Sequence, residues 1–238
     1  ALIREADVYL LDEPISHLDA KLRHHMRGEL KAMSTQRNAT IVYVSHDYKE
    51  AMALSDRIAV LNAGKLMQLD VPEKVYHQPA HEFVASYLGD PPMSFLDAQL
   101  RQDNGTPFLE AGSLKMPVPQ KVADKIEEQS PQGKVRIGAR ATDLTIAPHQ
   151  TEQCVVPMEA YVTETYGYRN IITCQLPGSD LVQSVSPPEM KFKPGDAAWL
   201  DIRIDNVHLF GPDGLAISHP EMNNSNQAGS DPLPPAVE

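Results

Sequence analysis

Several features that would assign a sequence quickly to a class of protein are scarce or missing here. The 238 residues include only two cysteines, which are too few for a disulfide framework and lack the spacing of metal ligands. We expect both to be small buried groups in a reducing cytosol. No stretch approaches the roughly 18 apolar residues of a membrane-spanning helix. The opening residues, ALIREADVYLL, contain acids where a signal peptide is apolar, so we expect no signal peptide.

Positive charge is also scarce. The formal net charge is −11, and residues 93–238 hold 11 Lys and Arg against 19 Asp and Glu. Neutralising phosphates supplies most of the affinity of proteins for nucleic acids, so an acidic chain without a basic stripe predicts no nucleic-acid partner. The same deficit argues against direct adhesion to an anionic membrane.

Up to about residue 90, short apolar strands alternate with helices. VYLLD (8–12) predicts a strand, and a helix follows from Ala20 with one apolar stripe, formed by Leu22, Met26, Leu30 and Met33. TIVYVS (40–45) is continuously apolar, which predicts a strand covered on both faces. A strand, a helix and a second such strand form a βαβ unit and therefore a parallel sheet. A second helix over about 47–54 and a hairpin turning at residues 62–64 follow.

The pattern of predicted elements changes after GDPPM (89–93), which indicates a domain boundary. Beyond it, regular turns separate short strands, as in a small barrel or sandwich. WLDIRID (199–205) alternates with period 2, which places Leu200 and Ile202 inward and Asp201 outward. The polar, proline-rich end predicts a disordered tail. We therefore divide the chain into domains at residues 1–90 and 91–218, with a tail at 219–238.

Two adjacent acids, Asp12 and Glu13, stand at the end of the first strand. Functional side chains collect at the carboxyl ends of strands in open parallel sheets. One carboxylate there can hold Mg²⁺ while the other orients an attacking water, as phosphoryl transfer requires. The alternative is that the acids only end a strand or cap a turn.

The order of motifs resembles the ATP-binding subunits of ABC transporters. LLDE (10–13) looks like their Walker B strand, ISHLDAKLR (15–23) like the D-loop, and YVSHD (43–47) like the switch-histidine region. FKPGDAAWLDIRIDNVHLF (192–210) resembles the regulatory domain of importers of the sugar and glycerol-phosphate type. The implied fold is a partial P-loop NTPase α/β sheet followed by a mostly-β, OB-like (TOBE-type) regulatory domain.

The resemblance implies roles for five residues. Asp12 would support Mg²⁺, Glu13 would be the base that polarises water, and His46 would contact the γ-phosphate of ATP. Ser16 and Asp19 would face the second subunit of an ATP-sandwich dimer. Simpler roles stay open, because Asp19 suits a helix N-cap, Ser16 a turn and His46 a structural position.

The glycine-rich loop that wraps phosphates is missing. The sequence contains no G-x-x-x-x-G-K-[ST], and the family's glutamine loop and LSGGQ signature are absent as well. We therefore expect a C-terminal piece of a longer subunit, in which ALIREA is the tail of the signature helix. Such a piece is expected to be inactive alone.

The resemblance also implies partners and a location. They are a second ATPase subunit, identical or paired, and transmembrane permeases on the cytoplasmic side of the inner membrane, with a substrate-binding protein reached only indirectly. One rival hypothesis gives the activity of this chain to the β domain, as a protein-docking or ligand-sensing module. Another is a DNA-repair or chromosome ATPase, which the acidic charge disfavours, because strand-binding grooves need aromatic residues amid positive charge.

Overall fold

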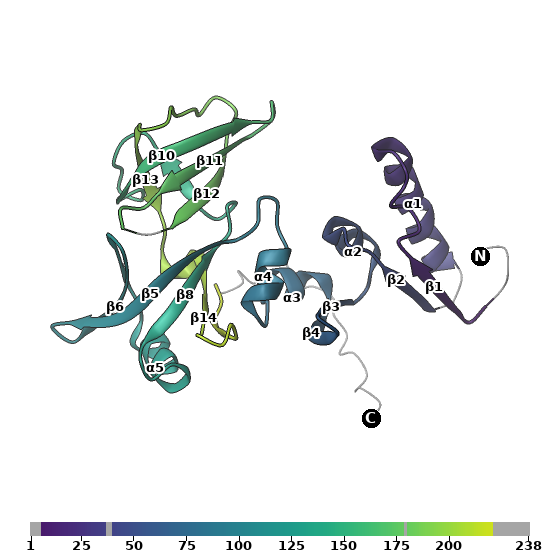
Figure 1. Ribbon diagram of the computed structural model, residues 1–238, viewed down its shortest axis with the longest axis horizontal. Helices are drawn as coiled ribbons and strands as arrows, with labels where there is room; N and C mark the ends of the chain where they lie inside the picture. The colour runs from purple at the N-terminus through teal and green to yellow at the C-terminus, as the bar shows by residue number, and fades with distance from the viewer. Residues whose placement is uncertain (1–5, 37–39, 179, 221–238) are drawn as a thin grey trace.

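The computed structural model describes residues 6–36, 40–178 and 180–220. The chain is elongated, with a small βαβ unit at one end, two larger sheets at the other, and short helices with a hairpin between them (Figure 1). We call residues 6–90 the N-terminal region and residues 91–220 the β-rich region. The predicted signature-helix tail and nearly all of the predicted disordered tail lie outside the described residues.

The first two strands form the predicted βαβ unit. β1 (Val8–Asp12) and β2 (Thr40–Val44) pair in parallel, and α1 (Ala20–Gln36) connects them. In the register of the pair Asp12 lies opposite Val44, so both strands end at the same edge. The predicted parallel pairing is therefore confirmed.

Helix α1 packs on one face of this two-stranded sheet. Tyr9 and Leu11 of β1 are buried, and Leu11 packs with Ile15 and with Leu30 of α1. On the opposite face four apolar side chains are exposed, by 47–76 %: Val8, Leu10, Val42 and Val44. The prediction that β2 is covered on both faces is wrong for the described chain. Side chains alternate across a strand, and only the face toward α1 is packed.

A hairpin and three short helices complete the N-terminal region. The elements are α2 (Tyr48–Leu54), β3 (Ile58–Asn62), β4 (Lys65–Asp70), α3 (Pro72–His77) and α4 (Glu82–Tyr87). β3 and β4 pair antiparallel through a turn in which Ala63 and Gly64 have φ of 48° and 77°, so the predicted hairpin is confirmed. Among the described residues, no helix combines the length and apolar character needed to cross a bilayer.

Two antiparallel sheets and one helix form the β-rich region. The six-stranded sheet has the order β15-β14-β8-β5-β6-β7, and the five-stranded sheet has the order β12-β11-β10-β13-β9. Their bounds are β5 (Ser94–Asp103), β6 (Thr106–Ala111), β7 (Leu114–Pro117), β8 (Lys134–Ala139), β9 (Thr145–Ala147), β10 (Val156–Thr165), β11 (Asn170–Gln175), β12 (Leu181–Ser186), β13 (Ala197–Asp201), β14 (Val207–Phe210) and β15 (Ala216–Ser218). Helix α5 (Gln120–Gln129) lies against the six-stranded sheet in Figure 1. The described chain is therefore mostly β.

One apolar core joins the two sheets. Leu96 and Ile137 of the six-stranded sheet, and Ile172 and Leu200 of the five-stranded sheet, are fully buried within it. Both cysteines are buried and free, which confirms the expectation that they are small buried groups. Burial raises the pKa of the Cys174 thiol to about 12, so this thiol stays protonated at neutral pH.

The alternating stretch WLDIRID does not form one continuous strand. β13 ends at Asp201, and a 3₁₀ turn, η1 (Ile204–Asn206), follows. Leu200 is buried as predicted, but Asp201 is also buried, with its Oδ1 2.8 Å from Nε of Arg203. The prediction that Asp201 points outward is wrong. The side chain of Arg203 stays 58 % exposed and contacts this carboxylate from the surface, a pairing that strand alternation cannot anticipate.

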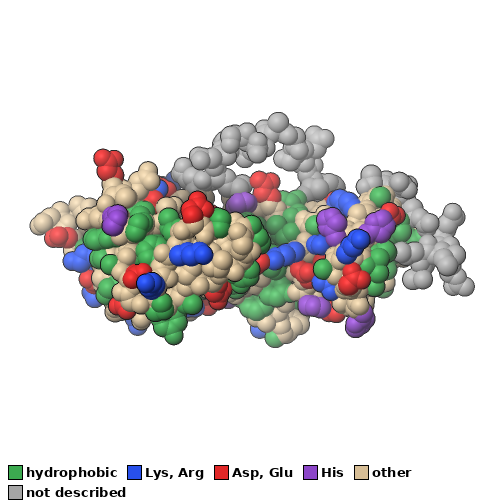
Figure 2. Space-filling view, turned by 90° about the horizontal axis from the view of Figure 1, so that it is seen from above, with side chains coloured by type: hydrophobic (Ala, Val, Ile, Leu, Met, Phe, Trp, Pro, Cys, Tyr) green, Lys and Arg blue, Asp and Glu red, His purple; other side chains and the backbone are tan. Residues whose placement is uncertain are grey.

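Charge is dispersed over the face shown in Figure 2. Lys and Arg side chains there are scattered among acidic and apolar ones and do not merge into one continuous patch. Binding to a phosphate backbone relies on several positive charges acting together. This face therefore offers no row of positive charge for a nucleic acid.

Candidate functional site

The candidate site lies where β1 and β2 end. The hydrogen-bond ladder continues one residue past β1, because the Glu13 amide donates to the Val44 carbonyl at 2.9 Å. The chain leaves β1 through Glu13 and leaves β2 through Ser45 and His46. Residues far apart in the sequence therefore meet at one edge, the edge at which open parallel sheets bind ligands.

Glu13 has an uncommon backbone conformation. Its φ is 43°, in the left-handed region that favours glycine. The hydrogen bond from its amide to the Val44 carbonyl holds it on one side, and its own carbonyl accepts from the Ser16 amide at 3.2 Å and from Ser16 Oγ at 2.9 Å. Such strain persists where the surroundings enforce it, often at functional sites. The conformation turns the carboxylate away from the strand and toward the loop after β2.

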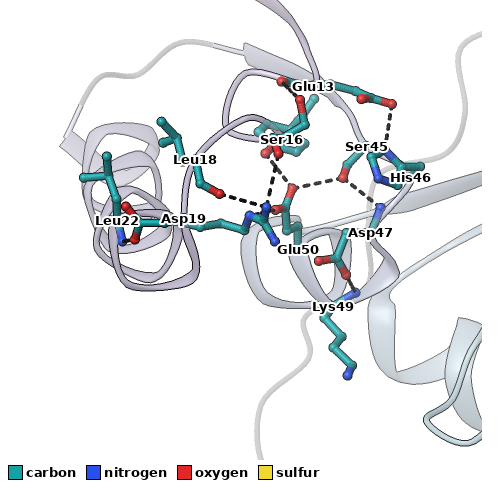
Figure 3. Close-up of polar contacts among 12 residues, drawn as sticks. Glu13, Ser16, Leu18, Asp19, Leu22, Ser45, His46, Asp47, Lys49 and Glu50 are labelled. Carbon is teal, nitrogen blue, oxygen red and sulfur yellow. Dashed lines mark hydrogen bonds and ion pairs between the residues drawn. The ribbon is translucent and has the colours of Figure 1, made fainter.

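The side chains of Glu13 and His46 are in contact. Oε1 of Glu13 lies 2.8 Å from Nδ1 of His46, although 33 positions separate the two residues (Figure 3). The hydrogen bond to Glu13 raises the pKa of His46, and the charge of Glu13 adds to the effect. Both side chains are open to solvent, at 71 % for His46 and 42 % for Glu13. The pair therefore keeps a proton in a position that a ligand can reach.

Asp12 lies on the uncovered face of β1, the face that it shares with Val8 and Leu10. Within the described chain its carboxylate has no hydrogen bond or ion pair. An ionised carboxylate only accepts, and Mg²⁺ is usually held by one or two carboxylates together with water and substrate phosphates. Asp12 therefore fits part of a magnesium site. In the part of the chain that is described, no group of three or more His, Cys, Asp or Glu is arranged to hold a metal.

Ser16 and Asp19 both make local contacts. Ser16 directs its hydroxyl to the Glu13 carbonyl, as described above, and thus closes a turn. The carboxylate of Asp19 accepts from the Leu22 amide at 2.9 Å, which satisfies a free donor in the first turn of α1. The simpler roles of both residues are thus present in the structure, and their predicted place at a subunit interface stays a prediction.

Sequence reasoning missed Glu50, a buried residue of α2 that holds the end of β2 in place. This residue of α2 is only 3 % exposed, and its Oε2 accepts from the hydroxyls of Tyr43 and Ser45, each at 2.9 Å. Ser45 Oγ in turn accepts from the Asp47 amide at 3.0 Å. Burial, together with the bond to Glu50, raises the pKa of Tyr43. Glu50 therefore fixes the end of β2 immediately before His46.

Arg23 of α1 connects Glu50 to the loop after Glu13. Its Nη2 donates to the carbonyls of Ser16 at 3.1 Å and Leu18 at 2.9 Å, and its Nε lies 3.8 Å from Oε1 of Glu50. The sequence carried a weak signal for Glu50. An Asp followed three residues later by Glu suggests a capping box, whose Glu would bond back to the helix start. The structure directs this carboxylate to β2 instead.

We compared the chain with known proteins. No protein-family model matches the sequence. The sn-glycerol-3-phosphate import ATP-binding protein of Rhizobium johnstonii is 34 % identical over 226 residues, which cover 94 % of this chain and 59 % of the relative. The trehalose/maltose import ATP-binding protein of Thermococcus litoralis is 36 % identical over 220 residues, which cover 88 % and 57 %. A cytoplasmic molybdate-binding protein of known structure covers 49 % of this chain and 94 % of its own, with 18 % identity and a TM-score of 0.38, too low to establish a shared fold.

The chain is therefore homologous to the ATP-binding subunits of ABC importers over most of its length. The resemblance inferred from the motifs is confirmed. The chain spans less than 60 % of the length of these relatives. Each relative's name gives the cargo of that protein alone.

Proposed function

We propose that this chain, a relative of the ATP-binding subunits of ABC importers, contributes the water-activating half of their ATP-hydrolysing site. One observation supports this most strongly: Oε1 of Glu13 and Nδ1 of His46 lie 2.8 Å apart at the shared edge of β1 and β2. We place these two strands in the sheet of a P-loop ATPase, with α1 as the helix that connects them.

The residues of this site divide the chemistry between them. Glu13 is the general base that orients and deprotonates the attacking water, since its carboxylate is exposed at the shared edge of β1 and β2 and is held by His46. His46 hydrogen bonds to Glu13 and presents the rest of its ring toward the γ-phosphate. Asp12 would hold Mg²⁺. A bound Mg²⁺ would neutralise the charge that develops on the phosphates.

The 238-residue chain itself contains no glycine-rich lysine loop to hold the phosphates. Positioning of reactants accounts for about 7–11 kcal/mol of a catalysed barrier, so Glu13 and His46 alone have nothing to act on. We propose that the chain alone neither binds ATP tightly nor hydrolyses it. Calorimetric titration with ATP and Mg²⁺, together with a phosphate-release assay, checks this, and saturable micromolar binding would refute it.

The proposal extends to partners and location. A second ATP-binding subunit would close on the nucleotide, with Ser16 and Asp19 near the interface. Closure would drive transmembrane permeases on the cytoplasmic side of the membrane, while a substrate-binding protein would be reached only through them. Sugars, polyols or glycerol phosphate are the proposed cargo class, because relatives are named for import of sugars and of sn-glycerol-3-phosphate. Residues 91–218 would form an OB-like regulatory domain.

A chimera tests the proposed role of the site. The part of the Rhizobium johnstonii relative that aligns with this chain is replaced by the chain itself, and ATP hydrolysis is measured. We expect activity in the chimera and a loss of at least about 100-fold on Glu13→Gln, in keeping with the removal of a general base. Glu73→Gln is the matched control, because Glu73 is an exposed acid in the first turn of α3. Equal activity in both variants would contradict the role of Glu13.

A second candidate function is protein docking by the β-rich region. Three tyrosines of β10 and the turn that follows it are exposed, at 59 %, 51 % and 73 % for Tyr161, Tyr166 and Tyr168. Tyrosine is enriched at protein interfaces because its ring is apolar and its hydroxyl is polar. Comparing the oligomeric state of residues 93–238 with that of the whole chain separates the two functions. Self-association by residues 93–238 alone would favour docking.

A further inference from the structure

The backbone of His46 is held by a residue outside the proposed catalytic pair. The hydroxyl of Tyr87, the last residue of α4, donates to the main-chain carbonyl of His46 at 2.6 Å. The Tyr87 ring is itself held in place, since it stacks on Phe83 with ring centroids 6.3 Å apart and an interplanar angle of 12°. His46 is thus fixed at two points, with its ring bonded to Glu13 and its carbonyl bonded to Tyr87.

Three residues after Tyr87, Asp90 links the start of α2 to the β-rich region. Oδ2 of Asp90 accepts from Lys49 Nζ of α2 at 2.6 Å and from Arg169 Nη2 at 3.3 Å. The backbone carbonyl of Asp90 also accepts from Arg169 Nη1, at 3.2 Å. The pKa values of the ion pair agree with this geometry: the hydrogen bond between Lys49 and Asp90 lowers the pKa of Asp90 and raises that of Lys49.

The orientation of the Arg169 side chain is set by two aromatic residues of its own turn. It lies in the turn between β10 and β11, and its guanidinium sits 5.6 Å and 5.5 Å from the ring centroids of Tyr166 and Tyr168. Its side chain is 21 % exposed, less than that of Asp90 or Lys49. The position of this turn therefore determines where the guanidinium meets Asp90.

We propose that Tyr87, Asp90 and Arg169 form a tether that positions His46 against Glu13 and transmits the position of the β10–β11 turn to the catalytic pair. Tyr87 and Asp90 are positioning residues, because they act through His46 and α2 without touching the reacting atoms. The inference rests on the proposed function, and it adds a route by which the β-rich region regulates ATP hydrolysis.

The energetics set the kind of effect to expect. Exposed ion pairs and single surface hydrogen bonds contribute little to overall stability. Breaking the tether should therefore leave the fold intact and change the fraction of time that His46 spends bonded to Glu13. The pKa of His46 reports that fraction, because the bond to Glu13 is the main cause of its increase. The charges of Asp47 and Glu50 also raise the pKa of His46, and the test leaves both residues unchanged.

The test is an NMR pH titration of the His46 ring in the 238-residue chain, with His46→Gln used to assign the signal among the nine histidines. Tyr87→Phe removes only the hydroxyl, Arg169→Gln breaks the far end of the tether, and Tyr168→Phe is the matched control. We expect Tyr87→Phe and Arg169→Gln to lower the His46 pKa by a few tenths of a unit, and Tyr168→Phe to leave it unchanged. Losing the positive charge of Arg169 through space would raise the pKa of His46, so the sign separates a tether from a field effect.

Two results would overturn the proposal, and they have different meanings. If the pKa of His46 is raised in the wild type and falls in Glu13→Gln, but is unchanged or raised in Tyr87→Phe and Arg169→Gln, the tether is refuted while the catalytic pair stands. If the pKa of His46 is ordinary in the wild type and insensitive to Glu13→Gln, the pair is not formed, and the tether and the proposed site are refuted together.

Discussion

The β-rich region and the βαβ unit of this molecule bury their apolar side chains to very different extents. The β-rich region has one core that joins both sheets, with residues such as Leu200 fully buried. In the described part of the βαβ unit, the core cluster contains three buried residues, Leu11, Ile15 and Leu30, while the outer face of β1 and β2 exposes four apolar side chains. Hydrophobic stabilisation scales with the apolar area removed from water. Stability thus concentrates in one region, and the proposed chemistry in the other.

Histidine shows the same contrast. His46 is exposed beside Glu13, which raises its pKa. His208 of β14 is buried, with its Nδ1 2.9 Å from Nδ1 of His219, and its pKa is lowered to about 3, mainly by burial. The N-terminal region therefore favours the charged form of His46, and the β-rich region favours the neutral form of His208.

The largest expected effect concerns the core. Leu200→Ala should lower the free energy of unfolding by about 2–5 kcal/mol, because it leaves a cavity in a fully packed site. Leu10→Ala should change it by less than about 0.5 kcal/mol, since Leu10 is 76 % exposed. Urea denaturation followed by circular dichroism and by the fluorescence of Trp199, the only tryptophan, measures both. Similar losses in the two variants would erase the contrast between the regions.

The next effect is a dependence on pH. Between about pH 6.5 and pH 3 the unfolded chain protonates His208, whereas the folded chain does not. This residue thus contributes full stability above pH 6.5 and loses it as the pH falls, by at most about 1.4 kcal/mol per pH unit. His208→Phe removes the titration and leaves the carboxylates unchanged. Urea midpoints measured across this pH range should fall more steeply in the wild type than in the variant, and parallel curves would show that His208 is not kept neutral.

A smaller effect comes from the backbone of Glu13. Glu13→Gly and Glu13→Ala both remove the carboxylate, but only alanine keeps a Cβ at a φ of 43°. We expect the glycine variant to be more stable than the alanine variant by about 1 kcal/mol. Thermal unfolding of the two variants gives the difference directly. An alanine variant as stable as the glycine variant would mean that position 13 carries no strain.

Local patterns predicted much of the fold. The apolar strands at 8–12 and 40–45 with a helix between them required a parallel pair, and the turn at residues 62–64 required a hairpin, as the structure confirms. Periodicity failed where burial depends on which groups pack against a strand. Asp201 is buried beside Arg203, and β2 is packed on one face only. The pattern of one sequence shows whether a side chain prefers a buried position, but it does not show which group packs against that side chain.

The site shows the same limit. Adjacent acids after one strand, and a histidine after the next, were enough to predict that Glu13 and His46 lie near one edge, because parallel strands end together. The left-handed backbone of Glu13 and the buried carboxylate of Glu50 were not predictable. The first depends on hydrogen bonds that Glu13 donates to Val44 and accepts from Ser16, and the second on the hydroxyls of Tyr43 and Ser45. The division of the chain at residue 90 stays a prediction.

The most direct test of the catalytic pair is the pKa of His46 in the wild type, in Glu13→Gln and in Asp12→Asn, measured by NMR titration of the 238-residue chain. We expect a value above the ordinary 6.5 in the wild type, a return toward 6.5 in Glu13→Gln, and little change in Asp12→Asn, because only Glu13 contacts the ring. The same pKa in the wild type and in Glu13→Gln would show that the two side chains do not act as one unit, and would contradict the proposed site.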